Sequence, residues 1–178
     1  MDLHEKLVGS KSIYKGRVFD VQVDTVVLPD KKQVMREFVV HKQAVAILPI
    51  HDDGKIVLIR QYRHCTSEEL LEIPAGSIDD GEKPEEALQR ELAEETGFIA
   101  KKFTRLCSAY TTPGFTNEFT HFYVAKGLAP EERKGDDDEF IEVKTFTKDE
   151  VMVMIKNDTI KDAKTILALS YYYLNHPA

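Results

Sequence analysis

Two glutamates four positions apart, Glu91 and Glu95, are the side chains in this sequence best suited to chemistry. They lie in a segment that begins with Pro84, which suits a first helical turn because its missing N–H is not needed there. Gly97 suits the cap that ends a helix, where a residue with positive φ is common. The sequence therefore predicts a helix over about residues 84–96 that carries both carboxylates one turn apart.

The expected direction of these carboxylates indicates a metal site. At about 100° per residue, Glu95 falls on the same side of the helix as Leu88 and Leu92. Glu91 falls beside that stripe, one turn back. Two carboxylates one turn apart repel each other, and a buried carboxylate costs several kcal/mol unless it is paired or bound to a metal. Hard oxygen ligands favour Mg²⁺ or Mn²⁺. The alternative is an acidic surface helix whose glutamates pair with Arg90 and with lysines elsewhere.

The glutamates belong to a longer pattern. Gly76 is followed after five residues by Glu82, and after seven more by residues 90–98, which read Arg-Glu-Leu-Ala-Glu-Glu-Thr-Gly-Phe. This pattern resembles the Nudix box at every fixed position. The box is the signature of hydrolases that act on nucleoside diphosphates linked to another group.

The resemblance implies a role for each of these residues. The implied metal ligands are Glu82, Glu91, Glu94, Glu95 and the backbone carbonyl of Ala75. Glu94 is also counted as catalytic, and Arg90 is expected to hold the glutamates in position rather than to touch substrate.

Length and composition describe an ordinary globular chain. It has 178 residues, of which 42% are hydrophobic and 31% charged, and one domain is the simplest expectation. The net charge of −7 argues against nucleic acid as a partner. We expect no membrane partner, since no apolar run approaches the roughly 18 residues of a membrane span and the N-terminus lacks a signal segment. Cys65 and Cys107 are the two cysteines, which favours a reduced, cytoplasmic setting.

Residues 1–42 are predicted to form an antiparallel β segment ahead of a Nudix hydrolase domain over residues 43–178. Polar and apolar side chains alternate over residues 18–25, and a turn at 30–32 leads into a second strand at 34–41. Two such strands are marginal alone, so they are expected to pack on something else.

A closer resemblance, to the ADP-ribose pyrophosphatase group, implies what that partner is. In this group the N-terminal strands exchange across a dimer, which implies a homodimer here. Arg36 and Glu37 match positions that present polar groups to the nucleotide; the alternative is a solvent-facing pair on an edge strand. Arg63 falls where the group carries a substrate-binding arginine, a side chain able to grip a diphosphate through two hydrogen bonds. The alternative for Arg63 is a surface salt bridge.

The run 111–118, Thr-Thr-Pro-Gly-Phe-Thr-Asn-Glu, contains the feature that bears on substrate. By propensity it is a loop between strands at 102–110 and 119–125. Its proline, about 15 residues beyond the box, resembles the marker of ADP-ribose pyrophosphatases. On that basis Gly114, Phe115 and Glu118 are predicted to bind substrate.

The acidic stretch 128–140 is, by composition, a solvated linker. In similar enzymes this loop closes over the substrate and supplies a glutamate as general base to the attacking water. Asp137 and Glu139 align with that stretch. Relatives often have glutamate at the position of Asp137, so Glu139 is preferred as the base.

The expected architecture is α/β, the Nudix fold, with a mixed β-sheet sandwiched between helices and an N-terminal antiparallel β segment. The pattern Thr147-x-x-Glu150 is a capping box that predicts a helix. A second helix is expected from Asp162 to near Leu174.

The predicted reaction is metal-dependent hydrolysis of ADP-ribose to AMP and ribose 5-phosphate. Two alternatives remain open at this point. One is a Nudix hydrolase for another nucleoside diphosphate sugar, and the other is a Nudix module that binds a nucleotide without cutting it.

Overall fold

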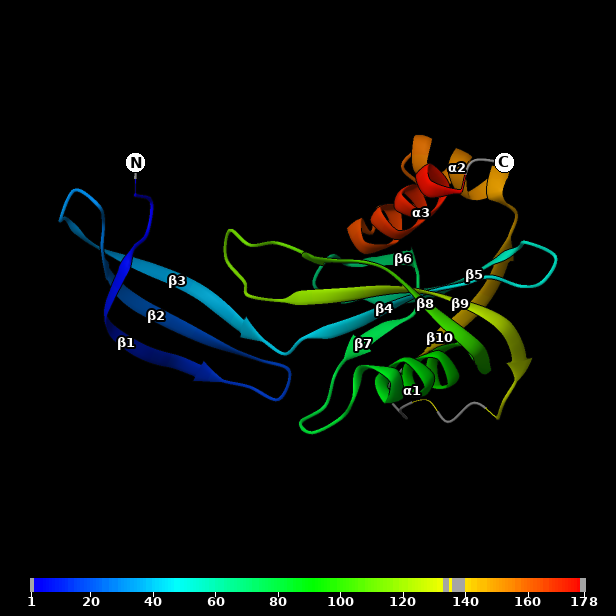
Figure 1. The fold of residues 1–178 in the computed structure, drawn as a ribbon, viewed down its shortest axis with the longest axis horizontal. Coiled ribbons are helices and arrows are strands. Elements are labelled where there is room, and N and C mark those ends of the chain that lie inside the picture. The colour runs from blue at the N-terminus through cyan, green and yellow to red at the C-terminus, as the bar shows by residue number, and fades with distance from the viewer. Residues whose placement is uncertain (1, 133–134, 136–139, 177–178) are drawn as a thin grey trace. The chain divides into compact units, whose positions relative to one another are not determined.

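The structure is a computed structural model that describes residues 2–132, 135 and 140–176. The chain divides into two compact units. The first consists of residues 1–43 with 110–119, and the second of residues 44–109 with 120–178. Each unit has its own sheet or sheets, and the elements are labelled in Figure 1.

The first unit is built on a three-stranded antiparallel sheet, β1 (Lys6–Lys15), β2 (Phe19–Val27) and β3 (Gln33–His41), in that order. The turn between β2 and β3 includes Lys31, whose φ is 70°. The sequence predicted two strands here and missed most of β1. Every residue of β1 is exposed, so no alternation of buried and exposed side chains marks it.

The second unit holds two sheets. Its strands are β4 (Ala44–Pro49), β5 (Ile56–Arg63), β6 (Glu68–Glu72), β7 (Ala75–Ser77), β8 (Phe98–Tyr110), β9 (Phe119–Pro130) and β10 (Ile141–Phe146). A mixed sheet has the order β7-β4-β9-β8, with β4 parallel to β9 and antiparallel to β7. An antiparallel sheet has the order β10-β5-β6. The predicted fold class is confirmed, with the difference that the strands form two sheets rather than one. Leu128 to Pro130, expected to be loop, end β9.

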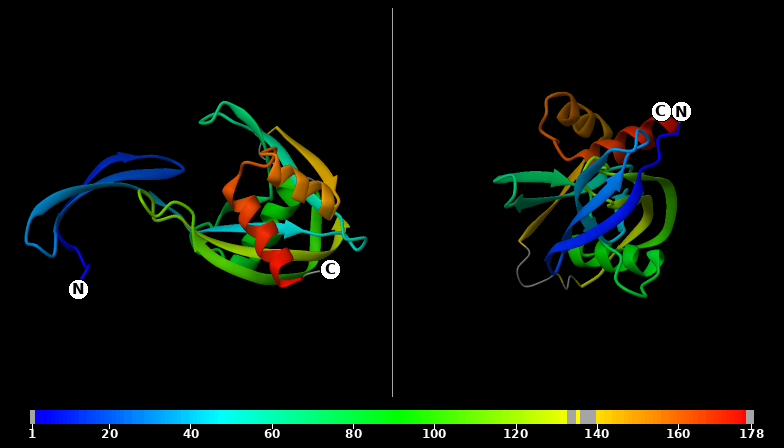
Figure 2. Two further views of the ribbon diagram at one scale, coloured as in Figure 1. Left: turned by 90° about the horizontal axis from the view of Figure 1, so that it is seen from above. Right: turned by 90° about the vertical axis from the view of Figure 1, so that its left-hand side faces the viewer.

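Strand β4 is buried on both faces, as a continuous apolar run predicts. Its side chains alternate: Val45 and Ile47 pack in the cluster formed with helix α1 (Pro84–Thr96), whereas Ala46 and Leu48 pack in the cluster formed with helices α2 (Lys148–Lys156) and α3 (Ala163–Asn175). Helix α1 and the pair α2 and α3 therefore cover opposite faces of this sheet, which Figures 1 and 2 show.

The helices begin and end close to where the sequence places them. Thr147 and Glu150 form the predicted capping box, with the Glu150 N–H donating to Thr147 Oγ1 at 3.3 Å and the Thr147 N–H donating to Glu150 Oε2 at 2.7 Å. Asp162 caps α3 by accepting from the Thr165 N–H at 3.0 Å. Gly97 ends α1 with a left-handed φ of 72°. Within the described residues, none of the helices has the length and apolar character needed to cross a membrane.

Candidate active site

Helix α1 turns two of its glutamates inward. Glu95 is 5% exposed and Glu91 is 9% exposed, beside the fully buried Leu88 and Leu92. The direction predicted from the helical periodicity is the one observed. A helix with all its carboxylates in water is therefore excluded, and the burial of two acids needs compensation from nearby groups.

Both carboxylates contact strand β7. The Ala75 N–H donates a 2.9 Å hydrogen bond to Glu95 Oε2. A Cβ built on Gly76 would lie only 2.0 Å from Glu91 Oε1 and 2.1 Å from its Cδ. The Glu91 carboxylate thus occupies the space that a side chain at position 76 would fill.

Arg90 contacts three of the glutamates at once. Its Nε and Nη2 donate to the two oxygens of Glu82, both at 2.9 Å. Its Nη1 donates to Glu91 Oε1 at 2.6 Å and to Glu94 Oε2 at 3.2 Å, and Nη2 also donates to the Ser77 carbonyl at 3.0 Å. The hydrogen bonds with Glu82 outweigh partial burial and raise the pKa of the Arg90 guanidinium above its ordinary value. Arg90 therefore stays charged.

The donor chemistry of this cluster fits a hard divalent cation. Three box carboxylates bond one guanidinium and a fourth, that of Glu95, accepts from the Ala75 N–H, and carboxylate oxygens are ligands that Mg²⁺ and Mn²⁺ prefer. In the part of the chain that the structure describes, no three acidic, histidine or cysteine side chains already converge to hold a metal ion. Because Arg90 bonds Glu82, Glu91 and Glu94, a cation must compete with it for their oxygens.

Arg63, at the end of β5, is bound to a buried carboxylate. Its Nε and Nη2 donate to the two oxygens of Glu72, both at 2.7 Å, and Glu72 is only 1% exposed. Lys164 of α3 donates to the same carboxylate and lies 3.0 Å from Asp162. The structure therefore pairs Arg63, whose own side chain is partly exposed, with a buried carboxylate.

This ion pair also determines the charge state of Glu72. Burial by itself raises the pKa of the Glu72 carboxyl, but the hydrogen bond from Arg63 and the charge of Lys164 outweigh it and hold the pKa below its ordinary value. The pKa of Arg63 is raised, first by Glu72 and less by the charge of Glu95, which is within electrostatic reach. No sequence pattern predicted a role for Glu72 or Lys164, which are 92 residues apart.

The other residues predicted to bind substrate lie in the first unit. Arg36 on β3 is partly exposed and pairs with Glu5, with its Nη2 2.6 Å and its Nε 3.1 Å from the two carboxylate oxygens. Glu37 follows it on β3 and is exposed. Neither is buried, so both can meet a ligand or a second chain.

The predicted substrate loop is bonded to the same strand. The Val39 N–H of β3 donates to the Phe115 carbonyl at 2.7 Å, and Phe115 itself is 56% exposed. Glu118 accepts a hydrogen bond from the Thr111 hydroxyl across the loop. Gly114 is exposed at its tip. The first unit therefore brings Gly114, Phe115 and Glu118 to the strand that carries Arg36 and Glu37.

Asp137 and Glu139 lie outside the described residues. The identity of the general base therefore stays a prediction.

Comparison with known proteins identifies the family. The family model of the NUDIX domain matches residues 40–169. The chain belongs to the Nudix family. This Nudix hydrolase is 41% identical over 174 residues to an ADP-ribose pyrophosphatase of Bacillus subtilis (strain 168), covering 97% of this chain and 94% of the relative. It is 42% identical over 172 residues to a methanol dehydrogenase activator of Bacillus methanolicus, covering 96% and 93%. A solved ADP compounds hydrolase matches with a TM-score of 0.87 and 26% identity, over 99% of this chain and 98% of that one.

A substitution at Gly76 tests the fit between β7 and Glu91. In Gly76→Ala the new methyl group would collide with the Glu91 carboxylate, so we expect that carboxylate to move and activity to fall by about 10- to 100-fold, as for loss of a supporting contact at a metal site. Steady-state kinetics of the Nudix hydrolase measure this. Gly9→Ala is the control, since among the described residues a Cβ there would meet only Thr25 Cβ at an ordinary contact distance of 3.9 Å, and its catalytic rate constant should stay close to that of the wild type. An unchanged catalytic rate constant in Gly76→Ala would contradict a role of the Glu91 carboxylate in the active site.

Proposed function

We propose that this Nudix hydrolase cleaves the diphosphate bond of ADP-ribose and releases AMP and ribose 5-phosphate. The observation that carries the proposal is the similarity to an ADP-ribose pyrophosphatase over 97% of the chain, which includes the N-terminal strands as well as the box. The name of the solved relative, an ADP compounds hydrolase, supports an adenosine diphosphate as substrate.

In this proposal the box glutamates hold Mg²⁺ or Mn²⁺. The ligands are Glu91 and Glu95 with Glu94, Glu82 and the Ala75 carbonyl. When bound, such ions offset the charge of the diphosphate and lower the pKa of a bound water. Arg90 orients the glutamates through its hydrogen bonds to three of them.

The remaining roles are proposed for residues outside the box. Arg63, held by Glu72, is proposed to bind the diphosphate, and Glu139, with Asp137 as the alternative, to take the proton of the attacking water. Arg36, Glu37 and the loop that carries Gly114, Phe115 and Glu118 are proposed to contact the nucleotide.

Product identification with and without metal tests the proposal. We expect AMP and ribose 5-phosphate from ADP-ribose in Mg²⁺, no release of either after EDTA treatment, and recovery when Mg²⁺ is restored, because the buried carboxylates need a cation to bind a diphosphate. Liquid chromatography of the products measures this. Release that persists in EDTA would contradict a metal-dependent reaction, and binding without cleavage would instead indicate a non-catalytic module.

A different nucleoside diphosphate sugar is the second candidate substrate, because none of the residues proposed here is assigned to recognition of the base. Comparing kcat/KM across ADP-ribose, ADP-glucose, GDP-mannose and UDP-glucose separates the two. ADP-ribose is expected to give the highest value, and a higher value for another compound would replace it as the substrate.

The first unit is proposed to form a homodimer through its N-terminal strands. Strand β1 carries large apolar side chains in the open, with Leu7 55% and Ile13 54% exposed, and exposed apolar groups of this kind mark interaction surfaces. Light scattering should give about twice the chain mass of 20.3 kDa. Ile13→Glu is expected to shift the protein toward monomer, whereas Ser12→Glu on the same exposed strand serves as the charge control. A monomeric wild type would contradict the proposal.

A cytoplasmic location belongs to the same proposal. Both cysteines are free thiols, Cys65 exposed and Cys107 half-buried, which suits a reducing compartment. Fractionation of the source cells measures the location, and recovery in the secreted fraction would contradict it.

A further inference from the structure

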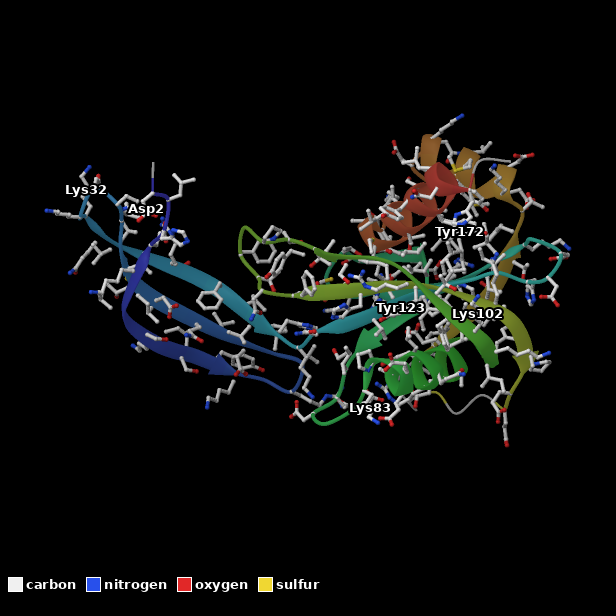
Figure 3. All side chains as sticks on the ribbon, viewed as in Figure 1. Asp2, Lys32, Lys83, Lys102, Tyr123 and Tyr172 are labelled. Carbon is white, nitrogen blue, oxygen red and sulfur yellow. The ribbon has the colours of Figure 1, made fainter. Side chains whose placement is uncertain are left out.

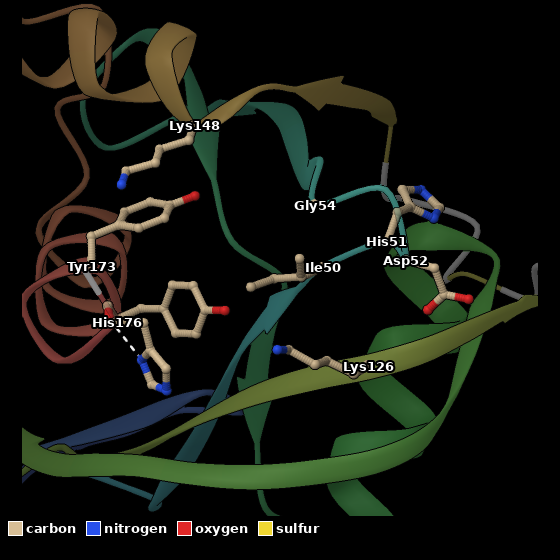
Figure 4. Close-up of a pocket in the computed structure, with 9 residues that line it drawn as sticks. Ile50, His51, Asp52, Gly54, Lys126, Lys148, Tyr173 and His176 are labelled. Carbon is tan, nitrogen blue, oxygen red and sulfur yellow. Dashed lines mark hydrogen bonds between the residues drawn. The ribbon is translucent and has the colours of Figure 1, made fainter. Parts of the chain in front are cut away.

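A cavity lies in the second unit, on the face of the mixed sheet that α2 and α3 cover (Figure 4). Its volume is about 420 Å³, within the range of small-molecule sites. It is lined by the turn after β4, by Lys126 of β9, by Lys148 of α2, and by Tyr172, Tyr173 and His176 at the end of α3. None of these residues belongs to the Nudix box.

Two lysines of this cavity place their ammonium groups over tyrosine rings and, in the described part of the chain, do not pair with carboxylates. Lys126 Nζ lies 5.8 Å from the centre of the Tyr172 ring, and Lys148 Nζ lies 4.8 Å from that of Tyr173. Among the described residues, neither lysine has an acidic group within ion-pair distance, whereas Lys164 of the same unit pairs with two carboxylates. A ring face attracts an ammonium group less strongly than an anion does, so both cations retain capacity for an anionic ligand.

Lys148 lies at the start of a helix. It is the first residue of α2, the helix end that carries partial positive charge and disfavours a cation. Asp149 and Glu150 offset that end of the helix from within its first turn. A bound anion here would therefore be attracted mainly by the lysine itself.

The tyrosines add neutral hydrogen-bond donors. Burial, with a smaller effect from Tyr172 and Asp149, raises the pKa of Tyr173 to about 12, so its hydroxyl keeps its proton at neutral pH. The Tyr172 ring stacks on the His176 imidazole, with ring centres 4.6 Å apart. In Figure 4 Lys126 and Tyr173 extend toward the cavity, and Asp52, the acid that lines it, lies at the far end from Tyr173.

We propose that this cavity is a second ligand site, separate from the Nudix box, that binds a phosphate monoester, with Lys126 and Lys148 of its lining supplying the positive charge. Two ammonium groups match the charge of a phosphate dianion, and the tyrosine hydroxyl donates to an oxygen of the same group. The volume of about 420 Å³ leaves room for the alcohol portion of the ester. This assignment does not depend on which diphosphate the box cleaves.

Calorimetric titration of the full chain with ribose 5-phosphate in EDTA tests the proposal, since removal of divalent ions keeps the ligand from binding through a metal at the box. We expect saturable binding to one site per chain. Lys126→Met and Lys148→Met should each weaken it about tenfold or more, the effect of losing one charge-assisted contact. Lys102→Met, an exposed lysine of β8 labelled in Figure 3, removes the same charge elsewhere and should bind like the wild type.

Amide chemical shifts distinguish the cavity from the box. On titration, the largest changes should occur at Lys126, Lys148 and Tyr173, with smaller changes at Glu91 and Glu95. If inorganic phosphate binds as tightly as ribose 5-phosphate, the site is assigned to free phosphate. If ribose 5-phosphate binds more tightly, the site is assigned to the monoester. Both results support an anion site. No binding, shifts confined to the box, or equal weakening in Lys102→Met would overturn the proposal.

Discussion

Replacing Glu95 with glutamine is expected to lower kcat for ADP-ribose hydrolysis by more than about 100-fold, beyond the roughly 10- to 100-fold cost of losing an outer-shell partner at a metal site. Glutamine keeps the side-chain oxygen that accepts the Ala75 N–H, so the packing of α1 on β7 should survive. What the substitution removes is a negative charge from a side chain that is 5% exposed. AMP release at saturating substrate and Mg²⁺ measures the effect.

The matched control is Glu85→Gln. Glu85 is exposed in the first turn of the same helix, so the change in charge and propensity is the same while the buried cluster is untouched. Circular dichroism and the melting temperature establish that both variants fold. Wild-type turnover in a folded Glu95→Gln protein would remove Glu95 from the site, whereas an equal loss in Glu85→Gln would point to the helix rather than the ligand.

Helix α1 could be predicted in detail because its determinants are local. A proline at its start, a glycine just beyond its end and leucines at helical spacing fix its bounds and the direction of Glu91 and Glu95. The same holds for the capping box of α2. In these segments the residues that decide the structure lie within one or two turns of each other.

Features that depend on distant partners could not be predicted in the same way. The division of strands into two sheets follows from pairings such as β5 with β10 and β4 with β9, which no local pattern specifies. The first strand lacks alternation because all of it is exposed. The bonding of the loop 111–118 to β3, through Val39 and Phe115, also joins residues far apart in the chain.

The ion pair around Glu72 is the clearest case of a site feature without a sequence signal. Glu72 follows Glu68 and Glu69 in an acidic run, and nothing local separates the one buried carboxylate from its exposed neighbours. Its partners come from β5 and α3. Since a buried carboxylate without partners is strongly unfavourable, these contacts are expected to be important for stability as well as for holding Arg63.

Glu72→Gln is therefore expected to destabilise the protein by about 3 kcal/mol, the lower part of the range for removing one partner of a buried ion pair. The lower part applies because Arg63 is partly exposed and water can solvate it again. Urea unfolding at neutral pH measures the change. Glu69→Gln is the control on the same strand, since Glu69 pairs with Arg60 at the surface and its loss should cost less than about 1 kcal/mol.

The difference in unfolding free energy between wild type and Glu72→Gln should also depend on pH. The pKa of Glu72 is lower in the folded protein than its ordinary value of 4.5, so the folded state favours the charged form. Its contribution is therefore fully present above the unfolded pKa and is lost as pH falls through the folded pKa. The two unfolding free energies should converge in acid below pH 4.5, while Glu69→Gln shows a much smaller change. If the difference in unfolding free energy between wild type and Glu72→Gln stayed constant from neutral pH to below pH 4.5, packing rather than charge would account for the stability that Glu72 provides.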